Sequence, residues 1–174
     1  MSQDILFKTE DHVFSYRVGG VLVENGKILL QRDIYGNHAV VGGHVSFMEL
    51  AKDTLVREFQ EELHVQIGVD DLLAVNENFF LWGDKPCHQI HFYYAVHLED
   101  DTFFREGMVS GYDELDNMRV DLDYVWIPLE ELDKISVFPG RSANCWKSTK
   151  VCFILSPANW NSKPVLLRPF LLLD

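Results

Sequence analysis

The alternation of apolar and polar residues predicts β-strands along much of the chain. The segment from Tyr16 to Val23 is apolar apart from Arg17, and a second, largely apolar run from Lys27 to Gln31 follows Asn25-Gly26. An Asn-Gly pair between two such runs is a strong hairpin signal, because both residues tolerate positive φ. We therefore expect a β-hairpin in the first part of the chain.

Further strands are predicted downstream of this hairpin. They cover His38–Val41, Leu72–Trp82, His88–Leu98 and Tyr124–Ile127. Within His88–Leu98 the even-numbered side chains share one face of the strand and the odd-numbered ones share the other. The polar segment Glu99–Asp123 is expected to form loops around at most one short strand. Pro128 suits the first turn of a helix, where its missing N–H costs nothing.

The periodicity changes after Gly42-Gly43. Apolar residues then recur at steps of three and four, at Met48, Ala51, Leu55, Phe59 and Leu63. This spacing is typical of an amphipathic helix. Because strands and helices interleave while hairpins are also present, we expect an α/β or α+β sandwich around a mixed β-sheet.

The net charge of the chain limits the kinds of molecule that it is expected to bind. The chain has 174 residues and a net charge of -12, but residues 134–174 are basic, so residues 1–133 carry -17. Such a body repels a long nucleic-acid backbone and attracts divalent cations. There is no apolar run long enough to span a membrane, no signal-peptide pattern and no CxxC pair. We therefore expect a reduced, cytoplasmic protein that binds neither membranes nor long nucleic acids.

Three glutamates of the predicted helix suggest chemistry. Glu58, Glu61 and Glu62 stand at i, i+3 and i+4, which gathers their carboxylates on one helical face. Like charges repel there unless a cation lies among them, and Mg²⁺ binds carboxylate and phosphate oxygens together. A solvated, glutamate-rich helix is the ordinary alternative. The residues upstream of the glutamates decide between the two interpretations.

With those residues included, the stretch resembles the signature of the Nudix hydrolase family, G-x5-E-x7-R-E-U-x-E-E-x-G-U, where U is bulky and apolar. The matching residues are Gly43, Glu49, Arg57, Glu58, Phe59, Glu61, Glu62 and Val65. The exception is His64, which stands where the family has glycine. That glycine ends the helix with positive φ, a conformation that histidine adopts at a modest cost.

The resemblance extends over roughly residues 14–135. It implies a single Nudix domain, 1–174, built as an α/β/α sandwich with a central mixed β-sheet, while residues 136–174 form a divergent basic segment. It further implies hydrolysis of a nucleoside diphosphate linked to another group X. The substrate would be a small nucleotide, such as a nucleoside triphosphate, a nucleotide sugar or ADP-ribose.

The resemblance also implies roles for individual residues. Mg²⁺ or Mn²⁺ would be bound by Glu58, Glu61, Glu62 and the carbonyl oxygen of Gly43. Arg57 would orient the carboxylates, and Glu49 would be structural or an outer ligand. Catalysis would rest on Glu61 as the general base, with Glu58 and Arg57. The alternative bases are acids of the polar segment, namely Glu106, Asp113, Glu114 and Asp116.

Candidates on the substrate side come from residue type alone. Arg17 and Arg32 could hold phosphates bidentately, and His38 is close in sequence to Gly42-Gly43. Aromatic residues that could stack on a base are Phe79, Phe80, Trp82, Tyr93 and Tyr94. No residue pattern identifies the nucleotide, and a homodimer is left open.

Two other functions use the same scaffold. A non-catalytic module could sense a nucleotide, but such modules commonly lose the carboxylates that this chain keeps. An isomerase acting on an isoprenoid diphosphate would need a cysteine in the cleft. Cys87 is the only cysteine within the matching core, and we expect it in a loop beside Pro86.

Overall fold

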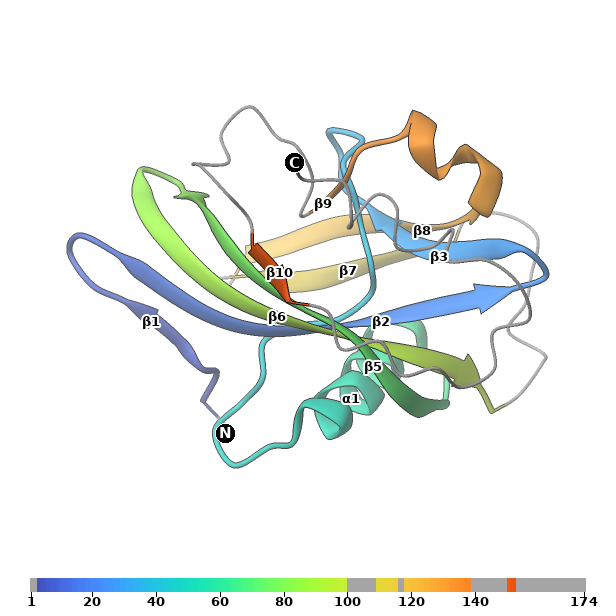
Figure 1. Ribbon diagram of the computed structural model, residues 1–174, viewed down its shortest axis with the longest axis horizontal. Helices are drawn as coiled ribbons and strands as arrows, with labels where there is room; N and C mark the ends of the chain where they lie inside the picture. Colours follow the sequence, from blue (N-terminus) through green and yellow to red (C-terminus); the bar gives the residue numbers. More distant parts are fainter. Residues whose placement is uncertain (1–2, 100–108, 116–117, 139–149, 153–174) are drawn as a thin grey trace.

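The computed structural model describes residues 3–99, 109–115, 118–138 and 150–152. These residues form one α-helix, one 3₁₀-helix and a curled, mixed β-sheet (Figure 1). The strands are β1 (Leu6–Lys8), β2 (Val13–Glu24), β3 (Lys27–Arg32), β4 (His38–Ala39), β5 (Ile67–Trp82), β6 (Lys85–Leu98), β7 (Val109–Leu115), β8 (Met118–Pro128), β9 (Val137–Phe138) and β10 (Lys150–Cys152). The helices are α1 (Ala51–Leu63) and the 3₁₀-helix η2 (Leu129–Lys134).

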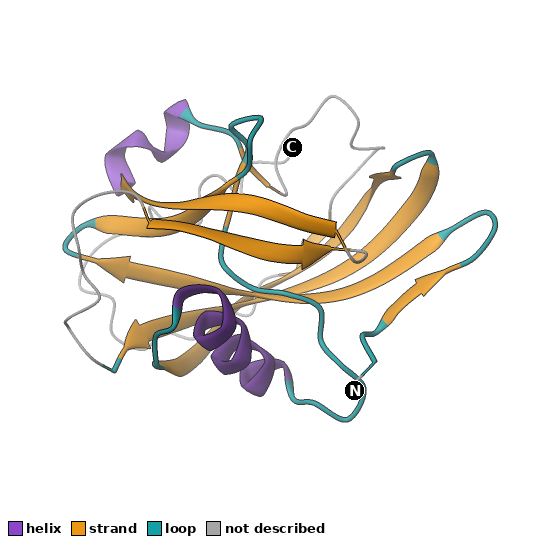
Figure 2. Ribbon diagram, turned by 180° about the vertical axis from the view of Figure 1, so that it is seen from behind, coloured by secondary structure: helices purple, strands orange, loops and turns teal. Residues whose placement is uncertain are grey.

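Strand β2 joins two halves of the sheet. Its first part pairs with β1 on one side and, in parallel, with β6 on the other, while its last residues form the hairpin with β3. Strands β5 and β10 continue the first half, and β8, β7, β4 and β9 continue the second. Figure 2 shows α1 lying across the sheet on the side that also carries β7 and β8. The expected α+β fold with a mixed sheet is confirmed.

Local signals located two of the turning points correctly. Asn25 and Gly26 have φ of 49° and 74° in the β2–β3 hairpin, as expected for this pair. His64 follows α1 with φ 58° and ψ 34°, and its N–H donates to the carbonyl oxygen of Gln60. Histidine therefore adopts the left-handed conformation that usually selects glycine at the end of a helix.

The prediction for Glu99–Asp123 was wrong. Strands β7 and β8 form an antiparallel hairpin there, and β8 also pairs with β3. The candidate bases Asp113 and Glu114 consequently lie in β7, opposite Val120 and Arg119, and not in a loop. Within the described residues β7 has a partner on one side only, and such an edge strand needs no apolar run. The other two candidates, Glu106 and Asp116, lie outside the described residues.

Two smaller predictions also need correction, and one short strand was not expected. Cys87 is not in a loop but is buried in β6. Strand β1 was not predicted, because three residues are too few to show alternation. Met48 does not belong to the helix, which begins at Ala51; it has φ 64° and a fully exposed side chain.

The apolar stripe of α1 fixes the helix against β2. Leu55, Phe59 and Leu63 are buried in one cluster with Val18 and Leu22 of β2. Each such side chain stabilises the fold by about 1.5–3 kcal/mol relative to exposure. A Cβ at Gly20 of β2 would lie 2.7 Å from the ring of Phe59, so glycine allows the helix to pack directly on the strand. This packing therefore fixes the position of the α1 glutamates relative to the sheet.

A second cluster occupies the opposite face of β2 and β3. It contains Val21, Ile28, Leu30, Val40, Ala74, Tyr93 and Leu132. Within the described part of the chain, no helix is both long and apolar enough to cross a membrane.

The His64→Gly variant should be more stable than the parent by about 0.5–1 kcal/mol, because glycine adopts positive φ without a Cβ penalty. Urea unfolding measures the difference. The His64→Ala variant is the control, because it loses the contact of His64 Nδ1 with the carbonyl oxygen of Gln60, 3.1 Å away, and keeps the strain. A His64→Gly variant no more stable than His64→Ala would show that backbone strain is unimportant here.

Candidate active site

The carboxylate of Glu58 packs directly against the backbone of Gly43. A Cβ built on Gly43 would lie 2.1 Å from Oε1 and 2.3 Å from Cδ of Glu58. The side chain of Glu58 is largely buried, with 11% of its surface exposed. Any residue other than glycine at position 43 would therefore displace this carboxylate. The loop before α1 and the middle of α1 form a single local structure.

Arg57 connects the acids around this contact. Its Nε donates to Oε1 of Glu49 at 2.9 Å, and its Nη2 lies 3.2 Å from Oε2 of the same carboxylate. Its Nη1 donates to Glu58 at 2.8 Å and to Glu61 at 3.1 Å. One guanidinium thus binds three carboxylates, two of them on its own helix and one just before it. Bidentate and charge-assisted bonds of this kind are the strongest hydrogen bonds in proteins.

These bonds shift the titration of both partners. The hydrogen bonds from Arg57 lower the pKa of Glu49, with a smaller contribution from the hydroxyl of Thr54. The bonds to Glu49 likewise raise the pKa of the Arg57 guanidinium above its already high value. Both groups therefore remain charged throughout the neutral range.

Glu62 has a separate support. The hydroxyl of Tyr124 in β8 donates to Oε2 of Glu62 at 2.7 Å. The side chain of Glu61, by contrast, is 60% exposed at the helix surface. Among the described residues no three His, Cys, Asp or Glu side chains are close enough together to hold a metal ion.

The donor set nevertheless suits Mg²⁺ or Mn²⁺. These ions prefer carboxylate and carbonyl oxygens, and glycine leaves space beside Glu58 for a close approach to the backbone. The carbonyl oxygen of Gly43 accepts the N–H of Val18 at 3.0 Å, and its second lone pair is available to a ligand. By donor type, Glu58, Glu61, Glu62 and Gly43 are therefore suitable ligands for a divalent ion.

The N-terminal segment supports the loop between Gly43 and α1. Backbone hydrogen bonds join Ile5 to Val45 and Phe47 to Gln3. Ser46 Oγ donates to Asp4 at 3.0 Å, and the N–H of Ser46 lies 3.3 Å from Oε2 of Glu49. The support for the Arg57 cluster thus extends to residues of the N-terminal segment, far before Gly43 in the sequence.

A row of buried polar side chains supports the same loop from the sheet. Asn78 donates to Gln89 at 3.1 Å, Gln89 donates to Ser15 at 3.3 Å, and the hydroxyl of Ser15 lies 3.1 Å from Nε2 of His44. These four residues are buried. The ring of His44 also lies against that of Trp82, with centroids 5.9 Å apart.

The three residues expected to bind substrate lie in different surroundings. Arg17 donates to the carbonyl oxygen of Gly42 at 3.0 Å, so it supports the loop. Arg32 forms an ion pair with Asp123 at 2.9 Å. His38 is buried at the start of β4, and burial lowers the pKa of its ring. None of the three therefore stands as a free cation beside α1.

The aromatic candidates are also separated. Tyr93 is buried in the second core cluster, and Tyr94 packs against the first. Phe80 contacts Phe138, and Phe79 lies against His88. Only Trp82 reaches the loop between Gly43 and α1, through its contact with His44.

Sequence reasoning missed Tyr124 and Asp4. Tyr124 was expected only as the first residue of a strand, and the register of β8 against β3 brings it over α1. Asp4 precedes every motif, and no local pattern signals its bond to Ser46. Both contacts join residues distant in sequence, so spacing along the chain could not find them.

The Gly43→Ala substitution should destabilise the protein mainly by displacing Glu58. We expect its cost in unfolding free energy to be at least about 1 kcal/mol larger in the parent than in a Glu58→Ala background, where the clash is absent. Urea unfolding of the two single variants and the double variant measures this coupling. Strictly additive costs would contradict the contact.

Acid should weaken the Arg57 cluster. Because the pKa of Glu49 is lower in the folded than in the unfolded state, its stabilisation is complete above the unfolded value of about 4.3 and is lost as the pH falls through the folded value. The Glu49→Gln variant should therefore lose less stability than the parent between pH 5 and pH 3. Urea unfolding across this range tests it, with Asp84→Asn as a surface control. An unchanged acid slope in Glu49→Gln would show that the pair contributes little.

The chain is similar to several proteins of known structure. Among solved structures, the MutT protein from Methanosarcina mazei is 20% identical with a TM-score of 0.49, over 74% of this chain and 86% of that chain. The C. elegans Ap4A hydrolase is 18% identical with a TM-score of 0.48, over 71% of this chain and 86% of that chain. A search of curated proteins found no match. The family model of the NUDIX domain matches residues 14–144, most of the sequence, and the chain therefore belongs to the Nudix hydrolase family.

Proposed function

We propose that the protein hydrolyses the diphosphate linkage of a nucleoside diphosphate linked to X, with Mg²⁺ or Mn²⁺ bound by Glu58, Glu61, Glu62 and the carbonyl oxygen of Gly43. The observation that carries the proposal is the packing of the Glu58 carboxylate against Gly43. A glutamate held on bare backbone, beside two further glutamates of the same helix, forms an oxygen-rich site that a side chain at position 43 would close. This arrangement suits a hard cation.

The bound ion would neutralise phosphate oxygens and lower the pKa of a water molecule, as divalent ions do in phosphoryl chemistry. The chain's own residues divide the remaining work. Glu58 and Glu62 are held by Arg57 and Tyr124, so their carboxylates are already oriented. Preorganised ligands of this kind reduce the cost of assembling the site.

Glu61 is the proposed general base. Its carboxylate is the most exposed of the three, and a base must reach both the substrate and solvent. Its contact with Arg57 at 3.1 Å orients the side chain without burying it. Asp113 and Glu114 of β7 remain the alternatives within the described strands.

Phosphate binding is proposed for Arg17 before Arg32 or His38. Arg17 is bonded to the loop that carries Gly43, and a guanidinium has further donors beyond the one used there. Arg32 is already paired with a carboxylate, and the lowered pKa of His38 favours its neutral form.

The Glu61→Gln variant should reduce turnover by about 10²–10⁴-fold while the fold survives, because the amide cannot accept a proton. Phosphate release would be followed with nucleoside triphosphates, ADP-ribose, nucleotide sugars and dinucleoside polyphosphates, with Mg²⁺, with Mn²⁺ and with EDTA. Glu130→Gln, an exposed acid of η2, is the matched control.

Metal-dependent turnover that EDTA abolishes would support the hydrolase assignment, and near-normal turnover by Glu61→Gln would reject Glu61 as the base. Binding of a nucleotide without turnover, in folded protein with metal present, would favour a sensor module over an enzyme.

A further inference from the structure

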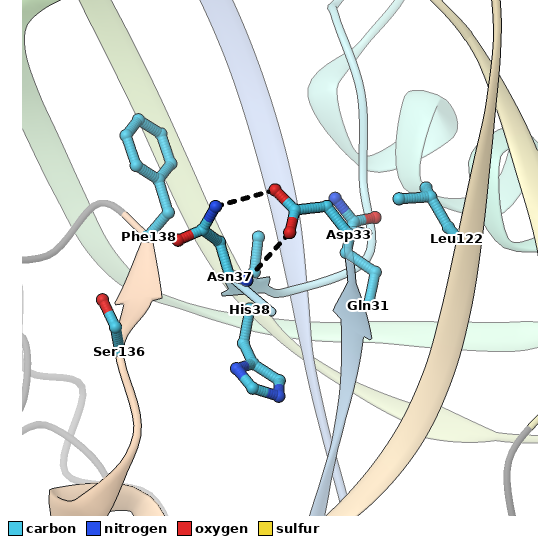
Figure 3. Close-up of a pocket in the computed structure, with 8 residues that line it drawn as sticks. Gln31, Asp33, Asn37, His38, Leu122, Ser136 and Phe138 are labelled. Carbon is cyan, nitrogen blue, oxygen red and sulfur yellow. Dashed lines mark hydrogen bonds between the residues drawn. The ribbon is translucent and has the colours of Figure 1, made fainter. Parts of the chain in front are cut away.

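A pocket of about 360 Å³ opens at the end of β3 (Figure 3). Its walls come from β3, β4, β8, β9 and the turn between β3 and β4. The lining residues are Gln31, Asp33, Asn37, His38, Ala39, Leu122, Ser136 and Phe138. We call it the Gln31 pocket. Its volume is within the range of sites for small molecules.

The register of the strands connects the Gln31 pocket to α1. Tyr124, Gln31, Ala39 and Phe138 are successive Cα partners across β8, β3, β4 and β9. Directly opposed residues point to the same face of a sheet, so these four side chains form one row. Tyr124, at one end of the row, donates to Glu62. Gln31 is therefore one strand away from a residue that contacts a proposed metal ligand.

The carboxylate of Asp33, in the pocket wall, accepts hydrogen bonds from residues of its own turn. Oδ1 of Asp33 accepts the N–H groups of Tyr35 and Asn37, and Oδ2 accepts the side-chain amide of Asn37, each at 2.8 Å. Figure 3 shows the two contacts between Asp33 and Asn37. Asp33 and Asn37 thus shape the rim of the pocket, and the carboxylate of Asp33 is already hydrogen-bonded to Asn37.

Gln31 differs from these rim residues. Its Oε1 is buried and has no hydrogen-bond partner. A buried amide oxygen without a partner costs roughly 1–3 kcal/mol. The Gln31 amide is therefore an uncharged hydrogen-bonding group in the wall of the pocket.

The pocket's chemistry favours a base over a phosphate. Among the lining residues there is no Lys or Arg, so a phosphate would find no counter-charge there. The ring of Phe138 and the small side chain of Ala39 provide apolar surface for a planar group. A glutamine amide pairs bidentately with the adenine edge, whereas the guanine O6/N7 edge is read by Arg or Lys.

We propose that the Gln31 pocket binds the adenine ring of the substrate, with the Gln31 amide pairing to its amino edge and Phe138 forming the apolar wall. This proposal rests on the proposed function, because it assumes that the nucleoside diphosphate reaches from this pocket to the carboxylates of α1. It assigns base recognition to a glutamine, whereas residue type alone suggested aromatic residues for the base.

The test measures binding without turnover. Isothermal titration in EDTA would compare AMP with purine riboside 5′-monophosphate, which lacks the amino group, and with GMP and ribose 5-phosphate. We expect AMP to bind about 5- to 100-fold more tightly than the purine riboside nucleotide. Gln31→Met should remove this difference by weakening AMP alone, whereas Gln66→Met, an exposed control, should preserve it.

Several outcomes would overturn the proposal. They are equal binding of AMP and its amino-free analogue, an equal loss of both in Gln31→Met, tighter binding of GMP, ribose 5-phosphate binding as tightly as AMP, or no AMP binding at millimolar concentration. The comparison of AMP with its amino-free analogue uses the parent protein, so it tests the proposal even if Gln31→Met fails to fold. Hydrolysis would survive each of these results, and a failed Glu61→Gln test would leave these affinities unaffected.

Discussion

The site depends on one guanidinium. Arg57 binds Glu49, Glu58 and Glu61 at 2.8–3.2 Å, and without its charge these three neighbouring carboxylates would repel one another. This neutralisation explains how a chain body of strong negative charge can keep Glu58 largely buried. A phosphate-binding cation placed there would share these carboxylates with Arg57, so the arginine both stabilises the site and limits its charge.

Sequence patterns predicted much of this machinery because it is local. The glutamates, Arg57 and Gly43 lie within twenty residues, and helix geometry fixes their relation. The Asn25-Gly26 turn and the ending at His64 were likewise determined by neighbouring residues. The β7–β8 hairpin was missed because polar edge strands lack an apolar alternation. Gln31 was missed because only the pairing of three strands shows that it faces the same side as Tyr124.

The two faces of β6 differ in polarity, although both contain buried residues. Even-numbered residues such as Phe92 and Tyr94 pack toward α1, as an apolar face should. The opposite face carries Gln89 and His91, yet both are buried. The polar face of this strand is therefore not the solvent-exposed face. Through Ser15, its Gln89 is hydrogen-bonded to His44 in the loop before α1. The hydrogen bonds among Asn78, Gln89, Ser15 and His44 join this face to the loop, while Oδ1 of Asn78 and Nε2 of His91 are buried without a partner.

The parallel pairing of β2 with β6 has a consequence for how the protein is made. Val13 is opposite Cys87 and Leu22 is opposite Val96, so the strands meet only after a long intervening segment has been synthesised. Closing such a loop is slow, because its entropy must be lost before the contacts form. The segment of α1 leaves the ribosome before β6 does. Its row of acids is thus complete in the nascent chain well before the sheet that positions it.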